Sequence, residues 1–169
     1  MRKLLGNAAM LAICVALCLL LTGMTRVAQA DELDFHSFNG HMYAVIGKSM
    51  TWHEAKAYCE SLGCHLVTIT SEAEQLFIQS IISSKNHYWL GATDEKQEGV
   101  WEWVTGETWS YANWSRGQPD NAGGVEHYLH ITSDQWGRDY FSKWNDVPSN
   151  WGEIVGLVCE WGANVVNIR

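Results

Sequence analysis

The stretch from Gly106 to Val155 constrains this chain most, because it offers little predicted regular structure. It is rich in glycine, asparagine, serine and aspartate, and it contains both of the chain's prolines. So long an irregular stretch inside a compact domain is normally functional, or it holds structure that the sequence does not reveal. A bound ion is a third explanation, because an ion can replace a missing hydrogen-bonded ladder.

Five oxygen-bearing side chains gather in this stretch. Gln118 and Asp120 stand on either side of a proline, Glu126 follows a glycine pair, and Asn145 and Asp146 are predicted to lie on a second loop. Three carboxylates and two amide carbonyls suit a hard cation, since calcium takes about 6–8 oxygen ligands whereas zinc favours nitrogen or sulfur. The sequence therefore predicts a calcium site, and the absence of an EF-hand loop pattern makes it a site of another type.

Several short motifs accompany these residues along most of the chain. In order they are Cys59, Tyr88-Trp89-Leu90-Gly91, Trp101-Glu102-Trp103, Gln118-Pro119-Asp120, Trp144-Asn145-Asp146 and Cys159-Glu160. Together they resemble the C-type lectin domain, a calcium-dependent carbohydrate-binding family. The resemblance implies an α+β fold: two helices, two small antiparallel sheets and a long calcium-binding loop. It also implies a secreted lectin whose partners are glycans or glycoproteins.

In the family, Gln-Pro-Asp is associated with galactose-type sugars and Glu-Pro-Asn with mannose-type sugars. The resemblance therefore implies that Gln118, Asp120, Glu126 and Asn145 bind galactose or N-acetylgalactosamine as well as the ion, and that a cis peptide bond precedes the proline. Galactose-type members usually add an aromatic ring against the sugar. Trp136 is the candidate for this role, although it could equally be a cover for the loop.

The resemblance also implies an auxiliary calcium site at Asp94, Glu98 and Asn121, with Glu126 beside them. The next position, which is often acidic in the family, is His127. The alternative is that Asp94 and Glu98 are ordinary exposed acids of a surface loop.

The first thirty residues are predicted to be a signal peptide. They combine a basic start, an apolar run from Leu11 to Leu21 and the small-residue pattern Ala28-Gln29-Ala30. The alternative is an uncleaved anchor, although the run is short for a bilayer. Residues 31–169 would then form a single exported domain, either periplasmic or extracellular, with no membrane insertion after cleavage.

Charge argues against nucleic acid as a partner. Removing Arg2, Lys3 and Arg26 leaves 11 − 3 = 8 basic residues against 19 acidic ones, a net charge of −11. Such a surface repels nucleic acids and anionic membranes. The acidic excess could also serve only solubility, but its clustering in one region favours a metal.

Three cysteines remain in the predicted mature chain, namely Cys59, Cys64 and Cys159. The resemblance implies a disulfide between Cys59 and Cys159, which exported proteins can retain. Cys64 is interpreted as a small buried hydrophobic residue. An intermolecular disulfide and a catalytic thiol are the alternatives.

Two capping boxes predict two helices. The first opens at Thr51-x-x-Glu54 and ends near Gly63, with Trp52, Ala55, Cys59 and Leu62 on its inner stripe. The second opens at Ser71-x-x-Glu74 and runs to about Ile82, with Ala73, Phe77 and Ile81 inward. Extended segments are expected within 35–47 and 66–69, and at 88–92, 100–104, 129–132 and 157–161. Trp89, Trp101, Trp103 and Trp161 are expected in the core.

Two other functions are alternatives to a lectin. A protein-binding adhesin or host-interaction module could use the same fold, because fold does not determine function. A hydrolase is disfavoured, since the seven histidines form no H-E-x-x-H or zinc spacing. Paired acids that hold calcium would stay ionised and could not donate a proton, so the chain is not expected to be an enzyme.

Overall fold

The computed structural model describes residues 33–162, apart from the side chains of Trp136 and Arg138. The predicted signal peptide lies outside this range. The strands are β1 Phe35–Phe38, β2 His41–Ile46, β3 His65–Leu66, β4 His87–Thr93, β5 Glu102–Trp103, β6 Tyr128–Ile131, β7 Trp144–Val147 and β8 Ile154–Trp161. The helices are α2 Trp52–Ser61 and α3 Glu72–Ile81, with 3-10 turns η1 Ala122–Gly124, η2 Asp134–Trp136 and η3 Arg138–Tyr140. None of the helices in 33–162 has the length and apolarity needed to cross a membrane.

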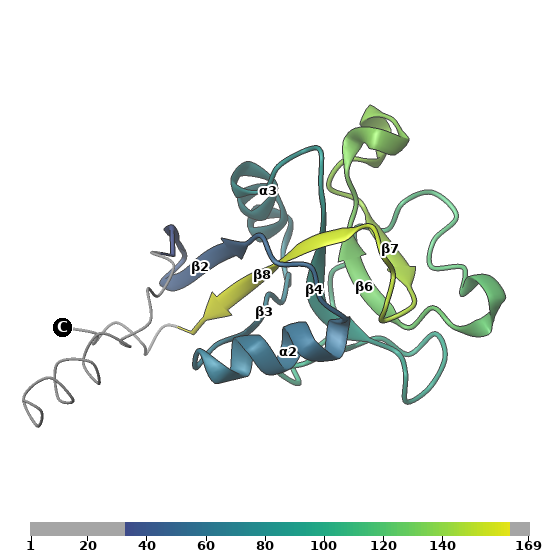
Figure 1. The fold of residues 1–169 in the computed structure, drawn as a ribbon, viewed down its shortest axis with the longest axis horizontal. Coiled ribbons are helices and arrows are strands. Elements are labelled where there is room, and N and C mark those ends of the chain that lie inside the picture. The colour runs from purple at the N-terminus through teal and green to yellow at the C-terminus, as the bar shows by residue number, and fades with distance from the viewer. Residues whose placement is uncertain (1–32, 163–169) are drawn as a thin grey trace, which may run out of the picture. The chain divides into compact units, whose positions relative to one another are not determined.

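The eight strands of residues 33–162 join in one mixed sheet. Its order is β1-β2-β8-β4-β6-β7, with β3 paired to β8 and β5 paired to β4. Strands β4 and β8 run parallel, and the other pairs are antiparallel. The α+β fold with two helices is as expected. Because β4 pairs with β8 on one side and β6 on the other, the strands expected as two small antiparallel sheets are joined into one mixed sheet. Helices α2 and α3 lie on opposite sides of the β2–β8 region (Figure 1).

Helix α2 begins as the sequence predicts. The Thr51 hydroxyl accepts a hydrogen bond from the Glu54 amide, and the Glu54 carboxylate accepts one from the Thr51 amide, which completes the capping box. Trp52, Ala55 and Cys59 are buried. Leu62 was expected on this stripe but is 37% exposed, because it follows the last helical turn as the C-cap.

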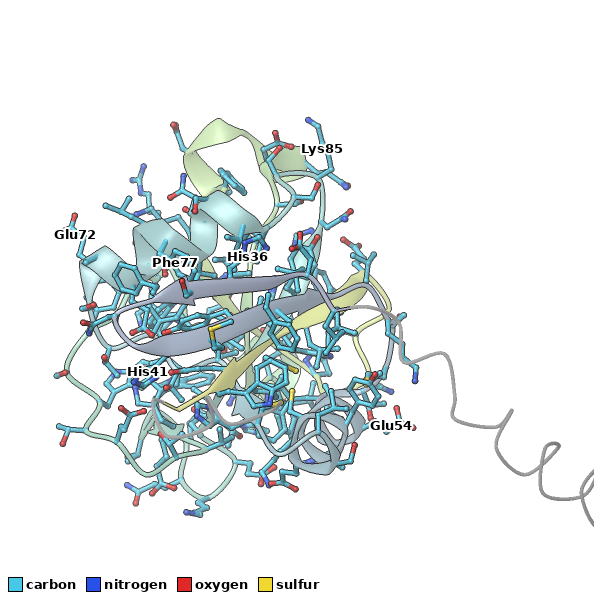
Figure 2. All side chains as sticks on the ribbon, turned by 90° about the vertical axis from the view of Figure 1, so that its left-hand side faces the viewer. His36, His41, Glu54, Glu72, Phe77 and Lys85 are labelled. Carbon is cyan, nitrogen blue, oxygen red and sulfur yellow. The ribbon has the colours of Figure 1, made fainter. Side chains whose placement is uncertain are left out.

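Helix α3 buries a different face from the one predicted. Ala73 is exposed and Phe77 and Ile81 are half-buried, whereas Glu74, Gln75 and Ile78 are buried. Figure 2 shows α3, with Phe77, lying along the β1–β2 hairpin. Hydrogen bonds explain the difference, since the Tyr43 hydroxyl donates to Glu74 and the Trp144 indole donates to Gln75. Buried polar groups with such partners can replace apolar ones.

The strands also depart from the expected pattern. The segment 35–47 is a hairpin rather than one strand, turning at Asn39 and Gly40 with φ of 48° and 85°. Asn145 and Asp146 lie on β7 and not on a loop, because β7 pairs along its whole length with β6. Of the two paired strands in the stretch with little predicted structure, β6 corresponds to the extended segment expected at 129–132, whereas β7 was not expected.

The core contains the tryptophans expected there. Trp89, Trp101, Trp103 and Trp161 are at most 7% exposed, and Trp52 and Trp144 are fully buried as well. Aromatic side chains of this size bury large apolar areas. Trp101, Trp103 and Trp144 pack where β5 and β7 meet the segment before Gln118, whereas Trp161 packs against Phe35 and Trp52 against Tyr128.

Candidate metal centre

Three carboxylates from different parts of the chain converge at one place. Asp120 and Glu126 lie on either side of η1, and Asp146 lies on β7. One oxygen from each carboxylate lies within 4.8 Å of the others. Asp146 is 1% exposed, Glu126 is half-buried and Asp120 is exposed, so the group extends from the protein interior to the solvent.

Two amide side chains next to these carboxylates have unused oxygens. Gln118 Oε1 and Asn145 Oδ1 are buried, and neither has a hydrogen-bond partner among the described residues. Leaving a buried acceptor unsatisfied costs about 1–3 kcal/mol. Two such oxygens beside three carboxylates indicate an arrangement that a cation would complete.

Backbone amides hold the carboxylates in position. The Asp146 carboxylate accepts hydrogen bonds from the Asp120 amide at 3.2 Å and the Asn121 amide at 2.8 Å. Glu126 Oε2 accepts one from the Ala122 amide at 3.0 Å. These bonds tie the Gln118–Glu126 segment to β7. The Gln118–Pro119 peptide bond is cis, as expected.

The segment before Gln118 is held by pairing with β7 and by aromatic packing. The Ser115 amide donates to the Trp144 carbonyl, and the Trp144 amide donates to the Asn113 carbonyl, both at 2.8 Å. The Trp114 ring lies 4.9 Å from that of Trp101 and 5.9 Å from that of Trp144. An otherwise irregular segment thereby gains a fixed position beside β7.

The negative charges of the carboxylates in this cluster repel one another. Burial raises the pKa of Asp146, and the nearby Asp120 charge raises it further. Burial also raises the pKa of Glu126, to which the charges of Asp146 and Asp120 contribute. A cation among these groups would relieve the repulsion.

The donor set fits calcium better than a transition metal. All five candidate ligands offer oxygen, and calcium prefers carboxylate and carbonyl oxygens in flexible geometry. The two buried amide oxygens without partners are the observation that supports this fit. Gln118, Asp120, Glu126, Asn145 and Asp146 would hold the ion.

Trp136, the candidate sugar contact, lies in η2 between β6 and β7. Its side chain is outside the described part of the structure. Its role therefore stays a prediction.

The expected auxiliary site is assembled differently from the first. Asp94, Glu98 and His127 offer ligand atoms within 4.8 Å of one another. His127 Nδ1 lies 3.0 Å from Asp94 Oδ1 and 3.5 Å from Glu98 Oε2, and the side-chain NH2 group of Asn121 donates to Glu98. A histidine nitrogen is a poor calcium ligand. Hydrogen bonds already engage these groups, in contrast to Gln118 and Asn145.

The cysteines depart from the expected pairing. Cys59, Cys64 and Cys159 are all free and buried, so the disulfide expected between Cys59 and Cys159 is not formed. The three sulfur atoms lie within 4.8 Å of one another. Cys64 is buried, as expected. It lies close to the other two because the chain turns at Gly63, after the end of α2, and enters β3, which pairs with β8.

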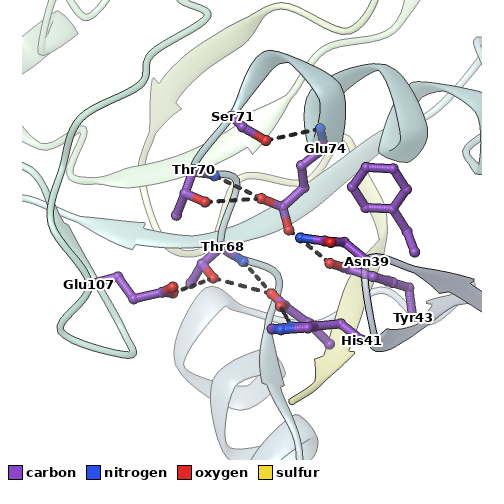
Figure 3. A pocket seen from close by; sticks show the side chains of 10 residues that line it. Asn39, His41, Tyr43, Thr68, Thr70, Ser71, Glu74 and Glu107 are labelled. Carbon is purple, nitrogen blue, oxygen red and sulfur yellow. Dashed lines mark hydrogen bonds and ion pairs between the residues drawn. The ribbon is translucent and has the colours of Figure 1, made fainter. Parts of the chain in front are cut away.

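A second polar group was missed by sequence reasoning. It surrounds a pocket of about 220 Å³ between β2, β8 and the start of α3 (Figure 3). The Glu160 carboxylate accepts from the Thr68 amide and lies 2.6 Å from His41 Nδ1, and Glu74 accepts from the Thr70 amide. Since these buried carboxylates have partners, the group serves to join β2, β8 and α3. No sequence pattern marked these residues as neighbours.

A family model described as "Lectin C-type domain" matches residues 48–160. The chain is 31% identical over 133 residues to a protein named "C-type lectin" from Micrurus corallinus, covering 75% of this chain and 80% of that one. It is 39% identical over 114 residues to "Hepatic lectin" from Gallus gallus, covering 66% of this chain and 55% of that one.

The fold has close structural neighbours. The cow C-type carbohydrate-recognition domain of CD23, solved in the presence of a GlcNAc2Man3 oligosaccharide, matches with a TM-score of 0.68 and 29% identity. The match covers 76% of this chain and 93% of that one.

Proposed function

The chain belongs to the C-type lectin domain family, and we propose from this that it is a secreted calcium-dependent lectin for galactose-type sugars. Carbohydrate binding and calcium dependence are typical of the family. The single observation that carries the proposal is the pair of buried, unpartnered amide oxygens on Gln118 and Asn145, residues that stand within two positions in the chain of the converging carboxylates Asp120 and Asp146.

The proposed calcium ion would explain how the site can bind a sugar in competition with water. Sugar hydroxyls are already well hydrated, so a binding site gains only from charged or pre-organised partners. Two neighbouring hydroxyls can each direct a lone pair at calcium and also hydrogen-bond to the side chains that hold it. The exposed Asp120 and half-buried Glu126 leave one side of the group open to such a ligand.

The order of the amide and the carboxylate supports galactose or N-acetylgalactosamine. A carboxylate only accepts hydrogen bonds, whereas an amide that holds the ion through its oxygen presents its NH2 group as a donor. Gln118 therefore offers a donor and Asp120 an acceptor. The reversed order would favour a diol of different stereochemistry, as in mannose-type sugars.

The test is retention of the purified chain on galactose and mannose resins, with calcium or with EDTA. Wild-type protein should bind the galactose resin with calcium and be released by EDTA. Asn145→Ala should abolish retention and calcium binding by calorimetry, because it deletes a buried ligand oxygen.

The matched control is Asn150→Ala, the same substitution at an exposed residue after β7. It should bind as the wild type does. Circular dichroism would confirm that both variants fold. Galactose retention that persists in EDTA, or equal retention of the two variants, would contradict the proposal.

A further inference from the structure

The three buried cysteines form a cluster that the metal centre does not use. Cys59 lies in the last turn of α2, Cys64 in the turn that leads to β3, and Cys159 in β8. Their sulfur atoms lie within 4.8 Å of one another. Each thiol is therefore within a small side-chain movement of a disulfide with either of the other two.

The three thiols differ in their access to solvent. Cys59 and Cys159 are 0% exposed, whereas Cys64 is 8% exposed. Cys64 is therefore the one of the three nearest to solvent, so that a small local opening would expose it to a dissolved oxidant before the other two.

The cluster also favours Cys64 as the attacking group. Its thiol lies 3.1 Å from the Cys59 carbonyl oxygen. Hydrogen bonds from the thiols of Cys159 and Cys59 lower the pKa of Cys64, and His65 lowers it further, whereas the pKa of Cys59 is raised. Since the thiolate is the nucleophile in disulfide exchange, Cys64 is the most reactive of the three.

We propose that Cys64 is the thiol through which a small-molecule disulfide oxidises the buried pair Cys59 and Cys159. The pair on its own is sealed inside the fold. Cys64 connects it to the solvent, and this role is independent of sugar binding.

The proposed sequence is balanced at each step. The Cys64 thiolate attacks a small disulfide RSSR, which forms a Cys64–SR mixed disulfide and releases RS⁻. The Cys159 thiol attacks the Cys64 sulfur and gives its proton to the departing RS⁻, which forms Cys64–Cys159 and releases RSH. Cys59 then loses its proton and attacks the Cys159 sulfur, which forms Cys59–Cys159 and returns Cys64 as a thiolate. Two protein thiols are oxidised, and one RSSR is reduced to two RSH.

The experiment follows oxidation of the reduced full chain by oxidised glutathione, using alkylation of remaining thiols and peptide mass spectrometry. Peptides that carry Cys14 and Cys18 are scored separately. A glutathione adduct should appear first on Cys64, followed by a Cys59–Cys159 linkage with Cys64 free. In Cys64→Ser, formation of that linkage should slow by more than about tenfold, because the buried pair must wait for local opening.

Two controls keep the test decisive if folding changes. In urea, the wild type and Cys64→Ser should form the Cys59–Cys159 linkage at similar rates, because burial no longer protects the pair. Cys159→Ser should accumulate a Cys64 adduct or a Cys59–Cys64 linkage. The proposal fails if folded Cys64→Ser oxidises at the wild-type rate, or if the first adduct forms on Cys59 or Cys159.

Discussion

At the scale of single residues, the neutral candidate ligands are stronger evidence for a metal site than the acidic ones. Exposed carboxylates cluster on many proteins without binding anything. Gln118 and Asn145 differ, because their buried oxygens have no partner within the described residues. A protein gains nothing by burying such groups unless something satisfies them. In the proposed lectin, these amides would also supply NH2 donors to the sugar hydroxyls.

A double substitution tests this role of the amide. Gln118→Glu with Asp120→Asn keeps the charge and the oxygen ligands but exchanges the donor with the acceptor. We expect the ratio of galactose to mannose affinity to shift toward mannose by about tenfold or more, because charge-assisted hydrogen bonds contribute about 1.5–3 kcal/mol each. Competition binding with the two monosaccharides measures the ratio.

Calcium affinity serves as the internal control for this variant. It should stay within a few-fold of wild type by calorimetry, since the ligand atoms remain oxygens. An unchanged sugar ratio with intact calcium binding would show that contacts outside this pair set the preference.

At the scale of elements, close packing of strands determines where glycine is required. Strand β8 lies between β2 and β4, and a Cβ on Gly156 would lie 2.4 Å from the Ile46 carbonyl oxygen. A Cβ on Gly91 would similarly lie 2.4 Å from the Leu66 carbonyl oxygen. These contacts are with backbone, which cannot move without disturbing the sheet.

Gly156→Ala is therefore expected to destabilise the domain by about 2–3 kcal/mol, in the upper range for overpacking. The free energy of unfolding from urea titration measures the loss. Gly152→Ala is the matched control, since its Cβ would meet nothing within 4 Å. It should change stability by no more than about 0.5 kcal/mol. Equal stability of the two variants would contradict the close approach of β8 and β2.

At the scale of the whole molecule, the sheet joins the two helices to the metal centre through β4, β6 and β8. Two buried histidines stand at this junction, with the His87 and His130 rings 5.2 Å apart and Trp151 packed against both. Burial lowers the pKa of His87, and burial together with the His87 charge lowers that of His130 to about 3. Both side chains are therefore neutral in the folded protein at neutral pH.

Acid should consequently weaken the fold even when no metal is bound. An unfolded histidine titrates near pH 6.5, whereas His130 in the fold titrates near pH 3. The stabilising contribution is thus complete above about pH 6.5 and is lost as the pH falls from there toward 3. Urea unfolding in EDTA at several pH values measures this loss.

His130→Gln should flatten this pH dependence, whatever its effect on stability at neutral pH. His53→Gln, a change at an exposed histidine, should leave it as in the wild type. If both variants and the wild type lose stability in parallel between pH 6.5 and 4, the buried histidine is not the cause.

Much of the fold followed from local signals. The capping box at Thr51 and Glu54 predicted the start of α2, and its apolar stripe predicted the buried Trp52, Ala55 and Cys59. Such signals act within a turn or two, so they can be read from neighbouring residues. The inner face of α3 was predicted wrongly, because Glu74 and Gln75 are buried by partners from distant strands.

The sequence by itself determined the family and the oxygen-donor chemistry of the candidate metal centre. The type of residue determines whether its side chain offers an oxygen donor, and the order of the motifs along the chain does not depend on the fold. Only the tertiary structure decided that Asn145 and Asp146 lie on a strand, that the strands form one mixed sheet, and that Cys64 joins the other two cysteines. Each depends on contacts between residues far apart in the chain, and strand pairing there outweighs local preference.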